Sequence, residues 1–150
     1  MSNAERRKAL IAPSDEIMKK AANGNKAALQ YMQQIGQVAR ILDDLVDMDH
    51  RVEPVNIIAV FRWLLVGCYK NSFFIANIGV LSAYHASALS AWEEAMTLEE
   101  GGEVSKMYAH VIKDFCLEIV PVVANLTGGY ELMREIEHKT WQVYMEPIGG

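Results

Sequence analysis

The chain has 150 residues, of which 51% are hydrophobic, and its 14 basic and 19 acidic side chains give a net charge of −5. This length suits one domain, which buries roughly 70% of the surface of its unfolded chain. A charged fraction of 22%, with only 10 glycines and 4 prolines, excludes disordered, collagen-like and low-complexity chains. The basic residues are scattered along the chain, so nucleic acid is not an expected partner.

The cysteines and the N-terminal sequence bear on the compartment. Cys68 and Cys116 lie in apolar segments without a cysteine or histidine at metal-ligand spacing, so neither zinc nor a disulfide scaffold is indicated. A reducing cytoplasm suits this pattern best. The opening MSNAERRKAL lacks the apolar region of a signal peptide, and Arg62 interrupts the longest apolar stretch. We therefore expect no export signal and no membrane span.

Residues 1–12 are expected to form a loose segment ahead of two helices. A capping Ser14 or Asp15 predicts a short helix of about ten residues, which ends near Asn23 in an Asn-Gly-Asn turn. A long helix should follow from Lys26 to about Met48. Its apolar residues recur at alternating steps of three and four, which predicts a helix packed in a bundle. These residues are Met32, Ile35, Ala39, Leu42 and Val46.

The middle of the chain predicts two further helices. Pro54 ends the polar break after the acidic run, and residues 55–69 are apolar on nearly all sides, as expected of a central helix. After a turn at residues 70–72, helical spacing continues from Phe73 to Glu100 for about seven turns, and Gly101-Gly102 stops it.

The last part of the chain predicts two helices, and the whole predicts an all-α fold. Residues 103–127 keep the helical pattern, with Pro121 as an expected kink. Gly128-Gly129 should close this helix, and 130–146 should form the last one. No segment alternates with period two, so we expect one single-domain bundle of five or six helices. The predicted core-facing positions of residues 103–127 are Val104, Met107, Val111, Phe115, Ile119, Val122 and Leu126.

An acidic run closes the long second helix. Asp43, Asp44, Asp47 and Asp49 fall within seven residues, where like charges repel and meet the negative end of the helix dipole. Asp43 and Asp47 are one turn apart and lie about 40° from each other around the helix. Such a pair can share Mg²⁺, which prefers oxygen ligands and is commonly shared with substrate phosphate. The run therefore predicts a site for Mg²⁺ and a diphosphate-containing ligand.

The segment Asp43-Asp44-Leu45-Val46-Asp47 resembles the first DDxxD motif of the class I isoprenoid synthases. The resemblance covers this motif and the helical fold class. It implies an isoprenoid-synthase-like bundle in which Asp43 and Asp47 ligate Mg²⁺ and Asp44 is a weaker or indirect ligand. The activity it implies is prenyl transferase or terpene synthase-like, with metal-assisted departure of diphosphate.

A second acidic pair is expected on the helix at residues 103–127. Asp114 and Glu118 are one turn apart, with His110 one turn before them, and loosely resemble the second acidic motif of the squalene and phytoene synthases. If they face the first motif, they would complete the metal site. The alternative is an interhelical salt bridge to Arg or Lys.

Four further side chains are candidates for binding the ligand. Arg40 and Lys113 could neutralise a diphosphate, although Arg40 could instead form ion pairs within its own helix. Asn77 and His85 share one side of a helix and would join the site if they face the aspartates. The alternative for His85 is a core histidine that is satisfied by a hydrogen bond.

Two other functions fit the sequence. The all-α NTP pyrophosphohydrolases use acidic pairs on a dimeric four-helix core of similar length, and Glu99, Glu100 and Glu103 could contribute to such a site, although these residues also suit an exposed helix end. A non-catalytic helical interaction or oligomerisation module, such as a phage or accessory protein, would instead leave the acidic run as a solvated helix end. A homodimer is compatible with each of these functions, because a short, apolar chain can leave a helix face uncovered.

Overall fold

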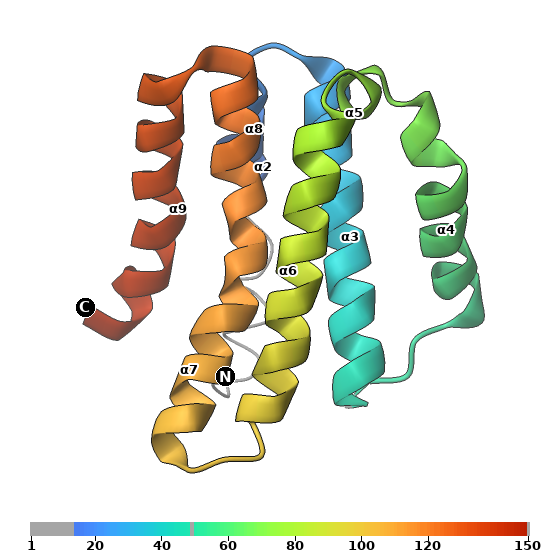
Figure 1. The fold of residues 1–150 in the computed structure, drawn as a ribbon. Coiled ribbons are helices and arrows are strands. Elements are labelled where there is room, and N and C mark those ends of the chain that lie inside the picture. Colours follow the sequence, from blue (N-terminus) through green and yellow to red (C-terminus); the bar gives the residue numbers. More distant parts are fainter. Residues whose placement is uncertain (1–13, 49, 150) are drawn as a thin grey trace.

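The computed structural model describes residues 14–48 and 50–149, with side chains described as far as residue 142. The loose segment expected at residues 1–12 lies outside the described residues. Figure 1 shows helices joined by short loops, and no strand occurs in the described part of the chain. The α-helices are α2 (Asp15–Ala22), α3 (Lys26–Asp47), α4 (Pro54–Leu65), α5 (Ser72–Ala76), α6 (Ile78–Leu98), α7 (Glu103–Lys113), α8 (Ile119–Gly128) and α9 (Tyr130–Gly149). Two 3₁₀-helices, η1 (Gly67–Lys70) and η2 (Asp114–Glu118), complete the described elements.

The all-α class is confirmed, but the expected number of helices is too low. Over residues 14–48 and 50–149 there are seven α-helices of eight or more residues and the short α5. One predicted helix breaks at Asn77, where the amide of the side chain donates to the carbonyl of Phe73 at 2.9 Å. Another breaks before Pro121, which lacks the N–H that would bond to the carbonyl of Leu117. The proline ring also crowds that carbonyl, and the preceding turn is the tighter η2.

Capping residues position the helix ends, as predicted at Ser14, near Asn23 and at Gly128-Gly129. The hydroxyl of Ser14 accepts a hydrogen bond from the amide of Ile17 at 3.3 Å and caps α2. The side chain of Asn25 accepts from the amide of Ala28 at 3.0 Å and caps α3. Asn23, at φ 49°, ends α2, and Gly129, at φ 90°, separates α8 from α9. Local side-chain chemistry thus sets these boundaries.

The core lies among α2, the first half of α3, α5, α6, α8 and α9. In Figure 1, α8 lies beside α9, and α2 lies close to α8, in agreement with the packing of α8 against both helices. Of the five apolar positions predicted on α3, Met32 is buried and the later four are only half-buried. The largest fully buried side chains are Tyr31, Met32, Leu81, Val120, Pro121, Val123 and Ile136.

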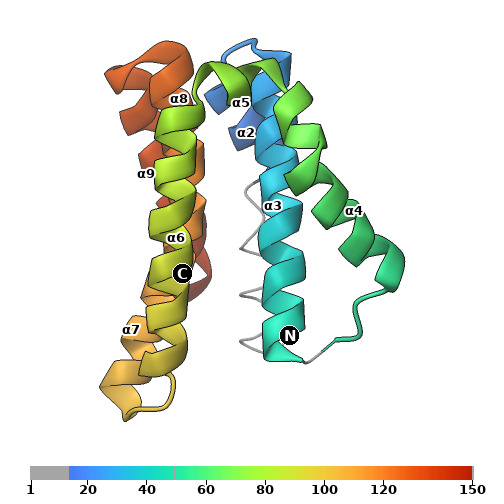
Figure 2. The same ribbon diagram turned by 45° about the vertical axis from the view of Figure 1, so that its right-hand side comes forward.

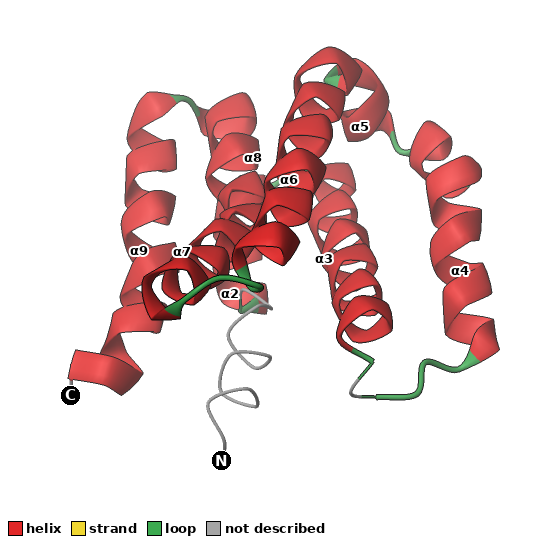
Figure 3. Ribbon diagram, turned by 60° about the horizontal axis from the view of Figure 1, so that its bottom comes forward, coloured by secondary structure: helices red, strands yellow, loops and turns green. Residues whose placement is uncertain are grey.

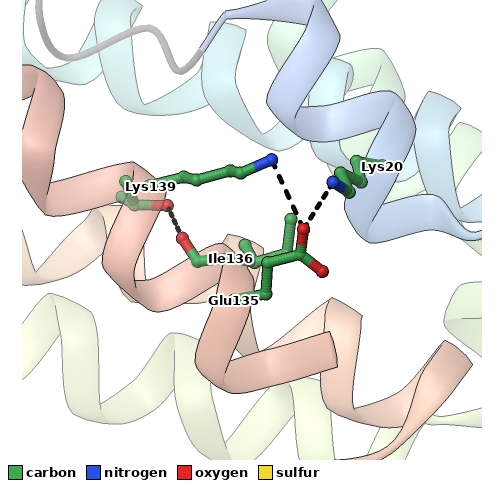
Figure 4. Close-up of polar contacts among 5 residues, drawn as sticks. Lys20, Glu135, Ile136 and Lys139 are labelled. Carbon is green, nitrogen blue, oxygen red and sulfur yellow. Dashed lines mark hydrogen bonds and ion pairs between the residues drawn. The ribbon is translucent and has the colours of Figure 1, made fainter. Parts of the chain in front are cut away.

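An ion pair joins α2 to α9 beside this core. The ammonium of Lys20 lies 2.5 Å from a carboxylate oxygen of Glu135, and the ammonium of Lys139 lies 3.4 Å from the same oxygen, as Figure 4 shows. The hydrogen bond from Lys20 holds the pKa of Glu135 below its ordinary value. These side chains are exposed to water, which screens their charges. The buried Ile136, next to Glu135 on α9, therefore contributes more to the stability of the packing of α9 than the exposed ion pair does.

The prediction that residues 55–69 form a central helix is wrong. Helix α4 lies at the edge of the molecule next to α3 (Figures 1 and 2), and none of residues 54–65, all of which the structure describes, is buried. Trp63 packs against the core, with its ring centroid 6.2 Å from that of Tyr31. Apolar residues on all sides indicate that a helix tends to be covered, but they do not specify the covering surface.

The predicted core-facing positions of the α7 region are also partly wrong. Val104, Met107, Val111 and Phe115 are each more than half exposed, while Ala109 and Lys113 are buried instead. Figure 3 shows α7 at the near end of the bundle, where α6 lies along one side of it.

Within the described residues, no helix combines the length and the apolar character that a membrane span requires.

Candidate functional site

The acidic run lies in the last turns of α3, which ends at Asp47. Met48, at φ 55°, adopts a left-handed conformation and turns the chain away, and its amide bonds to the carbonyl of Asp44 at 3.2 Å. Asp43 and Asp44 are half-buried, and Asp47 is more exposed. Asp49 lies outside the described residues. The run therefore occupies a helix end at the margin of the bundle.

The buried Lys113 connects this helix end to two other helices. Its side chain is only 4% exposed, and its ammonium lies 2.5 Å from a carboxylate oxygen of Glu99 and 3.8 Å from one of Asp47. The same ammonium lies 4.9 Å from the ring centroid of Trp92. The end of α7 is thus joined electrostatically to α3 and to α6 and the residue after it.

The contact with Lys113 gives one aspartate of the acidic run, Asp47, a structural role. Lys113, which was predicted to neutralise a diphosphate, instead contacts Glu99 and Asp47. Arg40 is exposed and forms no ion pair with any residue in the described part of the chain. Among those residues, no group of three or more histidine, cysteine or acidic side chains is placed to hold a metal.

The second acidic pair lies in η2, and Glu118 points toward α9. A carboxylate oxygen of Glu118 accepts a hydrogen bond from the indole N–H of Trp141 at 2.8 Å. Figure 1 shows α9 and α3 on opposite sides of the bundle. The structure thus brings Asp47 together with Lys113, while the described contact of Glu118 is made on the side of α9.

Glu118 and Glu137 form a pair of carboxyl groups between η2 and α9. Burial and the neighbouring Glu137 raise the pKa of Glu118 to about 7, although the hydrogen bond from Trp141 opposes this shift. One oxygen of Glu137 is buried and has no hydrogen-bond partner among the described groups. A proton on Glu118 would supply the missing donor. Glu118 can therefore hold a proton close to neutral pH.

The two polar candidates on α6 and its N-terminal boundary are placed apart from the aspartates. Nε2 of His85 lies 2.5 Å from the hydroxyl of Tyr31, inside a cluster of stacked rings that includes Phe74. Burial lowers the pKa of His85 and raises that of Tyr31. This contact satisfies His85 as a core histidine. Asn77 instead lines a cavity at the other end of the bundle.

That cavity has a volume of about 510 Å³ and is open to solvent. Its wall includes the α2–α3 turn at Asn25, 18 residues before Asp43, which corresponds to about 27 Å along α3. Two of its polar side chains bond within the chain: Asn23 donates to the carbonyl of Thr127 at 3.2 Å, and Thr127 donates to that of Ala21 at 2.7 Å. These bonds stabilise the loops and do not identify a ligand.

Several interacting residues were not predicted from the sequence. Glu99 was interpreted either as part of a pyrophosphohydrolase site or as part of an exposed helix end, and not as a partner of Lys113. Glu137 and Trp141 are one turn apart on α9, a spacing that indicates a shared face but does not name Glu118 as their neighbour. Contacts between helices distant in sequence leave no such local signal.

Comparison of the chain with protein-family models, with curated proteins and with solved structures gives no match. The functional interpretation therefore rests on the residues and their geometry.

Proposed function

We propose that this chain is a helical interaction module that binds a protein partner through α4. The observation that carries the proposal is that α4 is almost entirely apolar and yet has no buried side chain within residues 54–65. Its outer α4 face consists of Val55, Ile58, Phe61 and Leu65, each more than half exposed. Clustered apolar side chains on a protein surface mark sites of interaction.

The outer α4 face has the spacing of a helix-packing surface. Steps of three, three and four residues place its four side chains within about 120° of the helix circumference. The opposite side of α4 carries the half-buried Ile57, Val60 and Trp63, and α4 packs against α3. Arg62 is the single charged residue in the sequence of α4. A partner would therefore bury a nearly uncharged surface.

The acidic end of α3 supports a structural role within such a module. Lys113 is engaged by Glu99, Asp47 and Trp92, so these groups tie helices together. The cavity lined by Asn77 lies at the other end of α3, and its described polar bonds are internal to the chain. These features favour binding between proteins over chemistry on a small molecule.

A photo-crosslinking amino acid at position 61 tests the proposal. The matched control carries the same group at position 94, which is exposed on α6. Irradiation of cells that produce the chain should give adducts to protein from position 61 and few from position 94. Equal yields from both positions would show that α4 has no preferred partner, and the interaction module would then be rejected.

A second candidate function is the binding of Mg²⁺ and a diphosphate through Asp43 and Asp47, in an isoprenoid-synthase-like manner. The observations that favour it are the DDxxD spacing and the half-buried position of Asp43 and Asp44 at the edge of the bundle. Magnesium would carry the charge of the diphosphate, as it does when shared between carboxylates and phosphate oxygens.

Thermal shift tests this second candidate. Mg²⁺ and pyrophosphate are added separately and together to the wild type and to the Asp43→Asn/Asp47→Asn double variant. A ligand at 100 times its Kd adds about 2.7 kcal/mol to the stability, which amounts to several degrees in Tm. A joint rise that the double variant loses would support the site and justify trials with prenyl diphosphates and nucleotides. No shift in the wild type would reject it.

A further inference from the structure

We draw no further inference here: the strongest candidate, the outer α4 face of Val55, Ile58, Phe61 and Leu65, already carries the proposed function, and nothing in the structure shows what covers it.

Discussion

The two sides of the molecule use similar apolar helices but bury them to different extents. Helix α8 is enclosed by α2 and α9 and buries most of its side chains, including Val123 and Ala124. Helix α4 is equally rich in apolar residues, but among the described long helices it packs mainly against α3, and it buries none of residues 54–65. Apolar composition therefore shows a tendency toward burial, and the number of packed neighbours decides how far that tendency is realised.

The largest expected effect on stability is the difference between truncating an isoleucine on the α9 side and truncating one on the α4 side. Ile136→Ala on α9 leaves a cavity at a fully buried position and should lower the free energy of unfolding by about 2–5 kcal/mol. Ile58→Ala on the more exposed α4 should cost less than about 1 kcal/mol. Urea unfolding at one low protein concentration measures both. Equal losses would mean that α4 is as well packed as α9.

The next effect concerns the ion pairs that join the two sides. Lys113→Ala removes a buried cation and leaves Glu99 and Asp47 without it, which should cost about 2–3 kcal/mol, because both acids retain partial contact with water. Lys113→Met preserves most of the volume and should recover part of the loss. Thermal unfolding of Glu99→Gln, of Lys113→Met and of the double variant Glu99→Gln/Lys113→Met gives the coupling free energy between the two side chains. A neutral Lys113→Ala would contradict this linking role.

The α9 side should also respond to pH through Glu118. Its folded pKa of about 7 exceeds the ordinary value of 4.5, so the folded state binds the proton more tightly. This contribution is complete below pH 4.5 and is lost as the pH rises through 7, a change of about 1–3 kcal/mol. Tm measured at pH 5 and pH 8 should fall less in Glu118→Gln than in the wild type. The exposed Glu131→Gln should behave as the wild type does, and an unchanged slope in Glu118→Gln would refute the assignment.

The smallest expected effect on stability is the difference between changing the residue before α3 and changing the residue before α4. Asn25→Ala removes the side-chain cap of α3 and should cost about 1 kcal/mol. Glu53 precedes α4 and makes no capping bond, so Glu53→Ala should be close to neutral. Denaturant titrations of the two variants test the difference. A larger loss for Glu53→Ala would indicate that α4 depends on a contact at its start.

Sequence reasoning predicted most helix boundaries, because caps and turns act between residues close in the chain. Ser14 and Gly129 perform the predicted local roles, and Asn25, which was predicted only as part of a turn, also caps α3. The breaks at Asn77 and before Pro121 were predicted less well, since a helical pattern continues across both. The kink expected at Pro121 appears in the preceding turn, where the lost hydrogen bond has its effect.

The sequence identified residues of the candidate site, but it did not predict which residues they contact. The DDxxD spacing identified Asp43 and Asp47 from the sequence, and their role with Mg²⁺ stays a prediction. The contact between Asp47 and Lys113, and that between Glu118 and Trp141, join elements far apart in the chain. Local periodicity contains no information about such pairs.

The sequence by itself determined that this chain is helical, where most of its helices begin and end, and that three aspartates gather at the end of α3. Only the tertiary structure decided which apolar faces are covered: α8 and the start of α3 are buried, whereas α4 and one side of α7 are exposed. The physical reason is that helix formation depends on hydrogen bonds and caps within a few residues, while burial depends on which other helices approach.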